Sequence, residues 1–270
     1  MSAENLVAVD DLSLSFGRHR VLHSVGLDVA ARTAVGIVGE SGSGKSTLAK
    51  VLVGTHTPAS GHVSVAGIDV VNASHAERAR LRRTVQLIPQ DPYSSLDPRR
   101  TIGQTLAEAI DPRHPSVRRS RARILELLDQ VRMPADALSL YPHEFSGGQR
   151  QRIAIARGLA VNPTVIVADE ITSALDVSVQ AEVLDLIARL RAELQITLLF
   201  ISHNLAVVSA VCDEVVVMQH GQIVERGPVA VVFGAPQHPY TQRLLSSAPG
   251  APGFTLDAPA LDAIHERTAS

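Results

Sequence analysis

The sequence predicts an α/β domain with a largely parallel sheet, because runs typical of buried strands alternate with segments of helical spacing. The buried-strand runs cover 34–38, 84–90, 164–170 and 196–203. Between the last two lies "VQAEVLDLIARLRAEL", residues 179–194, whose spacing is helical. We therefore expect one α/β domain that carries a helical insertion.

The N-terminal quarter predicts antiparallel strands. Residues 6–30 alternate apolar and polar side chains around a turn at Gly17-Arg18, which is typical of a hairpin. Residues 61–70, "GHVSVAGIDV", predict a second hairpin. Between them, "STLAKVLVG" (46–54) has helical spacing and ends at Gly54, the expected C-cap.

The helical insertion is expected from about 101 to 160, with "RRSRARILELLDQV" (118–131) as its clearest amphipathic segment. It follows a loop interrupted by proline, "QDPYSSLDP" at 90–98. The tail from about residue 236 is rich in Pro, Ala and Gly and is expected to be loosely ordered. No internal repeat is apparent in the sequence.

Composition excludes several classes of protein. The chain has 270 residues, 45% of them hydrophobic, which allows one large domain or two small ones with a sizeable core. Aromatic residues make up 3% and the net charge is −2, so neither base stacking nor general attraction to nucleic acid is expected. The single cysteine, Cys212, excludes an internal disulfide and a multi-cysteine metal site. Its predicted role is that of a small buried hydrophobe.

The sequence predicts a soluble, cytosolic protein. The N-terminus "MSAENLVAVDD" is acidic and lacks the pattern of a signal peptide. No apolar run approaches the ~18 residues that a membrane span needs.

A glycine-rich loop, "GESGSGKST" at 39–47, follows the first buried-strand run and precedes the predicted helix. Gly39, Gly44, Lys45 and Ser46 fit the pattern G-x-x-x-x-G-K-S/T in its proper context between a strand and a helix. Glycines let backbone N–H groups surround an anion, and the helix N-terminus adds its dipole. The lysine supplies charge to the terminal phosphates and the serine hydroxyl suits Mg²⁺. The loop predicts a site for a nucleoside triphosphate.

Two carboxylates end the strand-like run "TVIVADE" at 164–170. Asp169 is expected to hold Mg²⁺, and Glu170 to polarise the attacking water. Neighbouring strand residues point to opposite faces, but a turn at the end of the strand would bring both to one site. The alternative interpretation is that these acids cap the next helix.

A second anion-binding pattern occurs in "EFSGGQRQRIAIARGLA" at 144–160, where a hydroxyl and glycine amides precede a helix. Ser146, Gly147, Gly148 and Gln149 resemble the signature of ATP-binding-cassette ATPases. By itself such a match is also typical of a helix-capping turn. The order P-loop, signature and acidic strand makes the resemblance specific, and it extends over the chain to about residue 235. In that family two cassettes pack head to tail, and the signature of one closes over the γ-phosphate held by the other.

Further landmarks match the same family. Gln90 stands where the family's glutamine loop contacts Mg²⁺ and the attacking water. "SALD" resembles the D-loop, whose Asp176 would face the opposite cassette. His203 stands at the switch histidine that contacts the γ-phosphate, although a lone histidine after a strand is more often only hydrogen-bonded locally. Phe16 stands where an aromatic ring stacks on adenine; the alternative is an ordinary position in a strand core.

The resemblance assigns three groups of residues. Catalytic roles fall to Glu170, His203 and Gln90. Magnesium would be held by Ser46, Gln90 and Asp169. ATP would be bound by Phe16, Gly39, Ser41, Gly42, Gly44, Lys45, Ser46, Thr47, Ser146, Gly147, Gly148, Gln149 and Asp176.

The sequence departs from the family pattern at three positions. Ile171 replaces a common proline, Phe145 a common leucine, and Phe16 a more frequent tyrosine. None of these removes a phosphate, metal or water contact, so an active site is still expected. Loss of the proline is expected to soften the turn after Glu170.

Two segments narrow the subfamily. "QDPYSSLDPR" (90–99) and "HPYTQRLL" (238–245) are similar to segments in the ATPase subunits of oligopeptide, dipeptide and nickel importers. Taken alone, His238-Pro239 predicts only a capped helix start. Some members of that group carry a C-terminal iron–sulfur cluster, which Cys212 alone could not hold. The basic segment 113–123 is interpreted as a solvated helix face in preference to a nucleic-acid or lipid site.

The resemblance implies a P-loop ABC-type nucleotide-binding domain at 1–235, with a mixed sheet core, an antiparallel β subdomain and a helical subdomain at about 91–160. Residues 236–270 would form a C-terminal extension. The expected function is ATP hydrolysis, with Mg²⁺, coupled to uptake of a peptide or nickel-type substrate. Expected partners are two membrane-spanning permease subunits, a second and non-identical ATPase, and indirectly an extracytoplasmic binding protein. The chain would be peripheral on the cytoplasmic face of the membrane, without a span of its own and without nucleic acid.

Two alternatives from other classes stay open on sequence alone. One is a soluble ABC ATPase of DNA repair or translation, which usually requires coiled coils or tandem cassettes. The other is a scaffold within a soluble complex that does not transport. Neither the transported substrate nor the identity of the second cassette follows from the sequence.

Overall fold

Two sheets and a group of helices make up the computed structural model, which describes residues 5–247 apart from the side chains of Tyr93 and Ser94. The larger sheet has six strands in the order β10-β9-β3-β8-β7-β6. Its members are β3 (Ala34–Val38), β6 (Val85–Ile88), β7 (Val165–Asp169), β8 (Thr197–Ile201), β9 (Glu214–Gln219) and β10 (Gln222–Pro228). All its pairings are parallel except that of β10 with β9.

The strand registers bring several loops to one edge of this sheet. In β3, β7 and β8 every residue is buried, as expected for parallel strands covered on both faces. Ile201 pairs with Ile37 on one side and with Asp169 on the other. The loops that follow β3, β7 and β8 therefore begin at the same carboxyl edge, where open α/β sheets bind their ligands.

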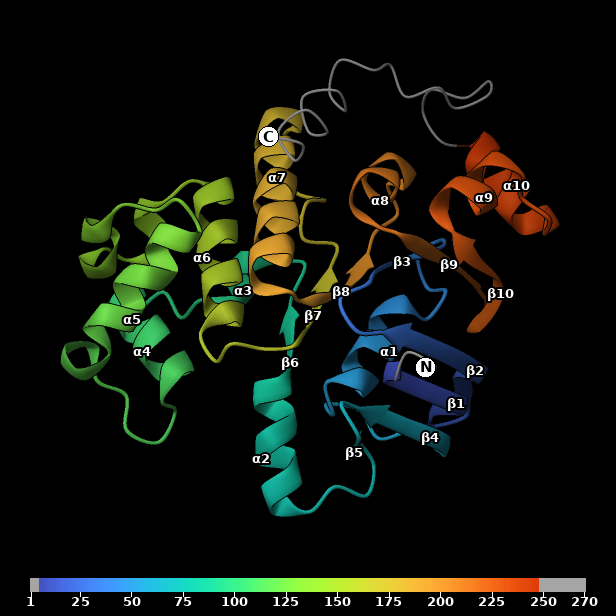
Figure 1. Ribbon diagram of the computed structural model, residues 1–270, viewed down its shortest axis with the longest axis horizontal. Helices are drawn as coiled ribbons and strands as arrows, with labels where there is room; N and C mark the ends of the chain where they lie inside the picture. Colours follow the sequence, from blue (N-terminus) through green and yellow to red (C-terminus); the bar gives the residue numbers. More distant parts are fainter. Residues whose placement is uncertain (1–4, 248–270) are drawn as a thin grey trace.

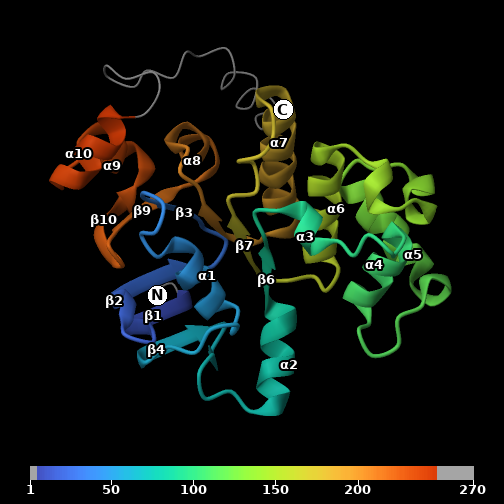
Figure 2. The same cartoon turned by 180° about the vertical axis from the view of Figure 1, so that it is seen from behind.

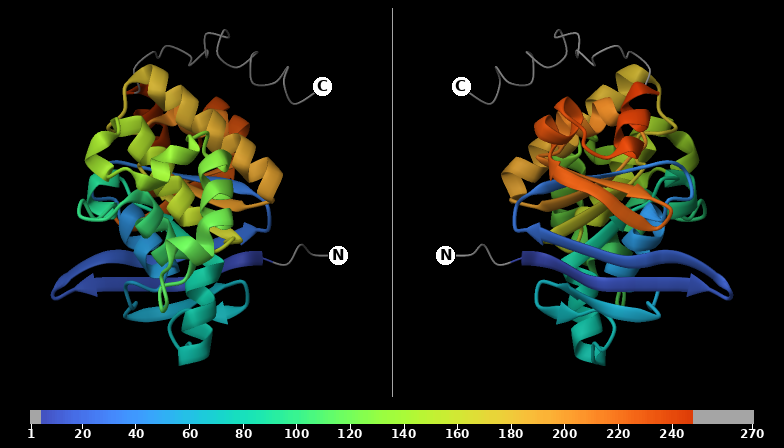
Figure 3. Two further views of the ribbon diagram at one scale, coloured as in Figure 1. Left: turned by 90° about the vertical axis from the view of Figure 1, so that its left-hand side faces the viewer. Right: turned by 90° about the vertical axis from the view of Figure 1, so that its right-hand side faces the viewer.

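The smaller sheet is antiparallel and has the order β2-β1-β4-β5. It contains β1 (Asn5–Phe16), β2 (His19–Ala30), β4 (Ser60–Val65) and β5 (Ile68–Asp69), which confirms both predicted hairpins. Figure 3 shows this sheet as a separate layer beside the larger one. Its buried side chains, such as Leu12, Leu22 and Val63, share one hydrophobic cluster with α1 (Lys45–Leu52).

The helices of the insertion lie together on one side of the molecule, and the other helices are spread around the two sheets (Figures 1 and 2). The insertion comprises α3 (Pro92–Ser95), α4 (Ile102–Ile110), α5 (Val117–Gln130) and α6 (Gly147–Leu159), with the 3-10 helices η1 (Ala135–Ser139) and η2 (Pro142–Glu144). The remaining helices are α2 (His75–Thr84), α7 (Val177–Leu194), α8 (Leu205–Val211), α9 (Val229–Gly234) and α10 (Pro239–Ser246). No helix within residues 5–247 is both long and apolar enough to cross a membrane.

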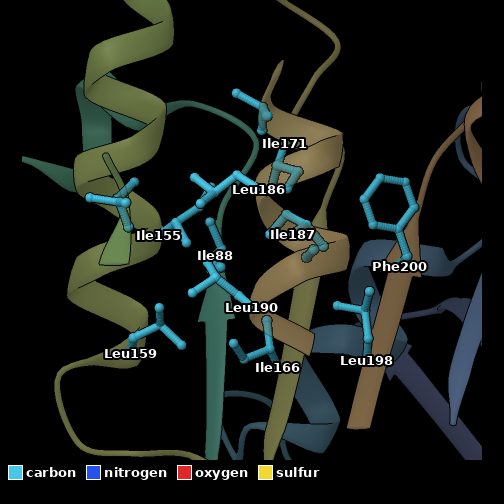
Figure 4. Close-up of a cluster of buried hydrophobic side chains, with 14 of the residues drawn as sticks. Ile88, Ile155, Leu159, Ile166, Ile171, Leu186, Ile187, Leu190, Leu198 and Phe200 are labelled. Atoms are coloured by element: carbon cyan, nitrogen blue, oxygen red, sulfur yellow. The ribbon is translucent and has the colours of Figure 1, made fainter. Parts of the chain in front are cut away.

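Side chains from α6, α7 and the sheet form one core beneath the insertion. Figure 4 shows Ile155, Leu186 and Phe200 among its members. Two residues that depart from the family pattern also lie in this core, Ile171 with 1% and Phe145 with 7% of its surface exposed. Burial of these apolar side chains stabilises the region around the loop after β7.

The C-terminal third of the described chain differs from the sequence expectations in two respects. The region 205–228 yields α8 and the strand pair β9–β10, which sequence analysis did not identify. The expectation of loose order from about 236 is wrong for α10, whose Tyr240 and Thr241 are almost completely buried. The helix start at His238-Pro239 is confirmed, with His238 as N-cap. The rest of the predicted extension, 248–270, lies outside the described residues, as do residues 1–4.

Candidate nucleotide site

The glycine-rich loop connects β3 to α1, as predicted, and its backbone allows only glycine at two points. Gly39 has a φ of 149°, and a Cβ there would lie 2.2 Å from the carbonyl oxygen of Met218. Gly44 is the N-cap of α1 with a φ of 102°, and a Cβ would lie 2.8 Å from Leu22. A side chain at either position would be strained and would also clash. The loop is therefore held tightly against β2 and β9.

Lys45 is buried inside the glycine-rich loop. Its ammonium donates to the carbonyls of Gly39, at 2.7 Å, and Glu40, at 2.8 Å. Burial lowers the pKa of Lys45, while the negative charges of Glu170 and Asp169 oppose that shift. These bonds close the loop into a ring around the ammonium, which places a positive charge where terminal phosphates would lie.

Ser46 and Asp169 face each other across the sheet edge. The Ser46 hydroxyl donates to Asp169 Oδ1 at 3.0 Å. Burial raises the pKa of Asp169, and the Ser46 hydrogen bond only partly offsets this. A hydroxyl and a carboxylate oxygen at this spacing are the hard oxygen donors that Mg²⁺ prefers.

Glu170 lies at a sharp turn after β7, with a φ of 48°. Its Oε2 accepts a hydrogen bond from Gln90 Nε2 at 3.2 Å and lies 3.3 Å from His203 Nδ1. The turn explains how Asp169 and Glu170 reach one site. The alternative that this acid pair caps the next helix is wrong, because Asp176 is the N-cap of α7.

Ser146 begins α6 as a helix cap. Its hydroxyl accepts from Gln149 N–H, and Gln149 Oε1 accepts from Ser146 N–H at 2.9 Å. This reciprocal capping box confirms the local structure but leaves a role toward phosphate untested. In Figures 1 and 2, α6 is separated from α1 by β6 and β7, so the signature and the P-loop lie apart within the chain.

Two further predicted ATP contacts are Phe16 and Asp176. Phe16 is 52% exposed, which contradicts a strand-core position and leaves its ring free to stack. Its ring meets that of His56 edge-on, with centroids 5.2 Å apart. Asp176 accepts from Val179 N–H, and this bond lowers the pKa of the Asp176 carboxyl. Ser41 and Gly42 are exposed in the P-loop, and Thr47 is half-buried in α1.

Sequence analysis missed two residues that organise this site. The Ser173 hydroxyl donates to the carbonyl of Glu170 at 2.9 Å and lies 3.3 Å from Gln90 Nε2, so it braces both. Gly221 N–H donates to the carbonyl of Ser43 at 3.0 Å and ties the P-loop to the β9–β10 turn. Ser173 lay within the "SALD" element, but its contacts depend on the tertiary fold.

Comparison with known families decides the identity of this chain. The family model described as ABC transporter matches residues 22–173. The chain belongs to the ABC transporter family. As a cassette of this family it binds and hydrolyses ATP.

Individual relatives agree with this assignment. The chain is 46% identical to the di/tripeptide transport ATP-binding protein DppF of Pseudomonas aeruginosa, over 85% of this chain and 72% of that protein. Its fold matches cbiO1 of Clostridium perfringens, part of an ABC transporter complex, with a TM-score of 0.77 and 26% identity, covering 86% and 91% of the two chains. It also matches the cassette MJ0796, solved as a dimer with ADP and Pi, with a TM-score of 0.73, 27% identity and coverage of 83% and 98%. These matches confirm the predicted ABC-type nucleotide-binding fold.

Proposed function

We propose that this cassette is the ATPase subunit of an importer that takes up peptides. The geometry that supports ATP hydrolysis is the carboxylate of Glu170, held by Gln90 and His203 at the sheet edge that also carries the P-loop. The substrate class rests on the similarity to a di/tripeptide transport protein. A nickel-type substrate, also implied by the sequence resemblance, is the second possibility.

The proposed chemistry is positioning of a water against the γ-phosphate. Glu170 orients and polarises the attacking water. Gln90 donates to its carboxylate, and Ser173 accepts from Gln90 and donates to the backbone carbonyl of Glu170. His203 would contact the γ-phosphate, and Lys45 neutralises charge on the terminal phosphates. Phosphoryl transfer gains most of its rate from such positioning and electrostatic stabilisation. The adenine would stack on the exposed ring of Phe16.

Magnesium is the metal that the site fits. Ser46 and Asp169 place a hydroxyl and a carboxylate side by side, and the amide oxygen of Gln90 is proposed as a further ligand. A bound Mg²⁺ would neutralise phosphate charge. A bound Mg²⁺ would favour the ionised form of Asp169 and so oppose the rise in its pKa that burial causes.

The proposed working unit contains two cassettes. Ser146 to Gln149 would complete the nucleotide site of a second cassette, because α6, which they begin, lies apart from the P-loop of its own chain (Figures 1 and 2). Asp176 would face that second cassette. The second cassette is proposed to be a different chain. The other proposed partners are two membrane-spanning permeases and, through them, an extracytoplasmic binding protein, with this chain on the cytoplasmic face of the membrane. The domain division at 235 and the helical subdomain at about 91–160 also remain proposals.

Purification from the source membranes tests the assembly. Tagged chain would be isolated in mild detergent and its companions identified by mass spectrometry. Two multi-span proteins and a second cassette are expected. Recovery only in the soluble fraction, with enzymes or nucleic acid attached, would instead support a soluble complex that does not transport.

Uptake of a labelled dipeptide tests the substrate class. In a strain lacking this chain, the wild-type chain is expected to restore uptake, whereas Lys45→Ala is not, since it removes the phosphate-binding charge. The Lys45→Ala protein must be shown to reach the membrane complex in equal amount. If uptake of Ni²⁺ depends on Lys45 and dipeptide uptake does not, the peptide assignment is wrong.

A further inference from the structure

A tyrosine near the end of the described chain touches the P-loop. Tyr240, in α10, is 2% exposed, and its hydroxyl oxygen accepts a hydrogen bond from the backbone N–H of Glu40 at 2.9 Å. The two residues are 200 positions apart in sequence. Sequence analysis treated the surrounding His-Pro-Tyr-Thr element only as a subfamily marker, with no chemical part.

The contact falls on one particular peptide group. The N–H of Glu40 and the carbonyl of Gly39 belong to the same peptide unit, and that carbonyl accepts from Lys45 Nζ at 2.7 Å. Tyr240 and Lys45 therefore hold opposite ends of this peptide. Rotating the unit would break both hydrogen bonds and leave the N–H of Glu40 without this acceptor.

Hydrogen bonds to β10 anchor the segment that precedes Tyr240. Glu225, on β10, accepts the N–H groups of Gln237 at 2.8 Å and of His238 at 3.1 Å. His238 then caps α10, since its Nδ1 accepts from Tyr240 N–H at 3.2 Å. Glu225 thus holds residues 237 and 238 against β10 directly before α10 begins. This fixes the start of the helix and, with it, the position of the Tyr240 ring.

We propose that Tyr240 is a positioning residue for ATP, which keeps the Gly39–Glu40 peptide and its Lys45 contact in the orientation that leaves the loop open to phosphate. It touches neither nucleotide nor the reacting atoms. The inference goes beyond the proposed function and requires only that the P-loop binds ATP.

The expected consequence is a loss of nucleotide affinity with turnover largely kept. P-loop contacts to phosphates are made in the ground state and in the transition state alike, so weakening them raises KM and changes kcat little. Tyr240→Phe keeps the ring and removes the hydroxyl. We expect mant-ATP with Mg²⁺ to bind the full-length variant about 3- to 10-fold more weakly, with a matching rise in the KM for ATP.

Two control variants separate positioning from general destabilisation. Ser246→Ala removes a hydroxyl of the same helix, which donates to the carbonyl of Arg243 within α10 at 2.9 Å. It should bind mant-ATP as the wild type does. Leu244→Ala removes packing of α10 on the core and should lower the melting temperature while leaving the KM for ATP unchanged.

Each outcome decides the proposal. Weaker binding by Tyr240→Phe, with Leu244→Ala normal in KM at an equal or larger loss of melting temperature, supports it. Unchanged affinity in Tyr240→Phe overturns it. An equal rise in the KM for ATP in Leu244→Ala also overturns it. Any weakening of the packing of α10 would then be enough to lower nucleotide affinity, with no specific part for the Tyr240 hydroxyl. Failure of the wild type to bind mant-ATP would count against the proposed function itself.

Discussion

In the nucleotide site, burial disfavours the charged forms of two residues that nucleotide binding would require, Asp169 and Lys45. Asp169 is 8% exposed, and its burial raises the pKa of its carboxyl, so the ionised form is disfavoured in the folded chain. Lys45 shows the corresponding effect, a pKa lowered by burial. Buried groups whose charged forms are disfavoured are typical of sites that bind a charged ligand. Here a bound phosphate would supply the negative charge that stabilises the Lys45 ammonium, and a bound metal the positive charge that stabilises the Asp169 carboxylate.

Asp169→Asn should therefore stabilise the nucleotide-free protein at pH 7 while abolishing ATP turnover that depends on Mg²⁺. We expect a gain in the free energy of unfolding of about 0.5–2 kcal/mol, the usual range for a stabilising change. A raised folded pKa means that this carboxyl favours folding below its ordinary pKa of 3.8, and that the contribution is lost as the pH rises through the raised value. The advantage of the variant should thus grow above pH 3.8 and then level off.

Denaturant unfolding measured between pH 3.5 and 7.5 checks this, with Asp176→Asn as the matched control. The pKa of Asp176 is lowered by its bond from Val179 N–H, so the same chemical change there should reduce stability at pH 7. A loss of stability in Asp169→Asn at neutral pH would contradict the argument.

At the scale of elements, α6 and α7 approach closely at the signature. A Cβ on Gly148 would lie 2.2 Å from Val179 Cγ1, whereas a Cβ on Gly147 would meet nothing closer than Leu175 at 3.8 Å. Valine is stiff about χ1, so it cannot easily turn aside. The second signature glycine thus has a packing role in addition to the phosphate role implied by the resemblance.

Gly148→Ala should destabilise the protein by about 1–3 kcal/mol through this clash, while Gly147→Ala should be neutral or slightly stabilising. Denaturant unfolding of both variants measures the difference. Adding Val179→Ala should restore most of the loss in Gly148→Ala, because it removes the atom that would be struck. Equal stability of the two alanine variants would show that α6 and α7 do not pack as described.

At the scale of the whole molecule, the two anion-binding patterns of this chain lie apart. The P-loop connects β3 to α1, and the signature begins α6 on the other side of β6 and β7 (Figure 1). One nucleotide could not engage both within a single chain arranged in this way. Two chains packed head to tail would bring the patterns together, and the similar cassette MJ0796 is dimeric in its solved structure.

Glu170→Gln should therefore trap an ATP-bound pair of cassettes, since binding stays intact while the water is no longer polarised. Light scattering after size exclusion, with ATP and Mg²⁺, would be run on the variant alone and with the second cassette recovered from membranes. A dimer is expected in at least one case, with ATPase turnover reduced by about 100-fold or more. The double variant Lys45→Ala, Glu170→Gln should remain monomeric.

Two outcomes would contradict this scheme. One is a Glu170→Gln protein that stays monomeric in both mixtures at saturating ATP. The other is a dimer of equal amount without nucleotide, because closure would then not depend on phosphates bound between the chains.

The sequence by itself determined the features that depend on local pattern. Apolar runs predicted the buried strands, because a strand covered on both faces needs apolar residues at every position. Alternation predicted both hairpins, because a strand covered on one face needs them at every second position. The P-loop was visible because its glycines, lysine and serine are adjacent in sequence. Glu170 was identifiable because it directly follows a buried strand whose carboxyl end must lie at the sheet edge. His203 was assigned through the resemblance to the family.

Tertiary structure alone decided what depends on contacts between distant segments. The hydroxyl of Tyr240 reaches Glu40 across 200 residues, and a tail rich in Pro, Ala and Gly gave no local sign of that burial. The close approach of Val179 to Gly148, and the hydrogen bond from Gln90 to Ser173, likewise arise only once helices and strands are packed. A residue's neighbours along the chain determine its backbone preferences, whereas its burial, its partners and its pKa follow from the atoms that folding places around it.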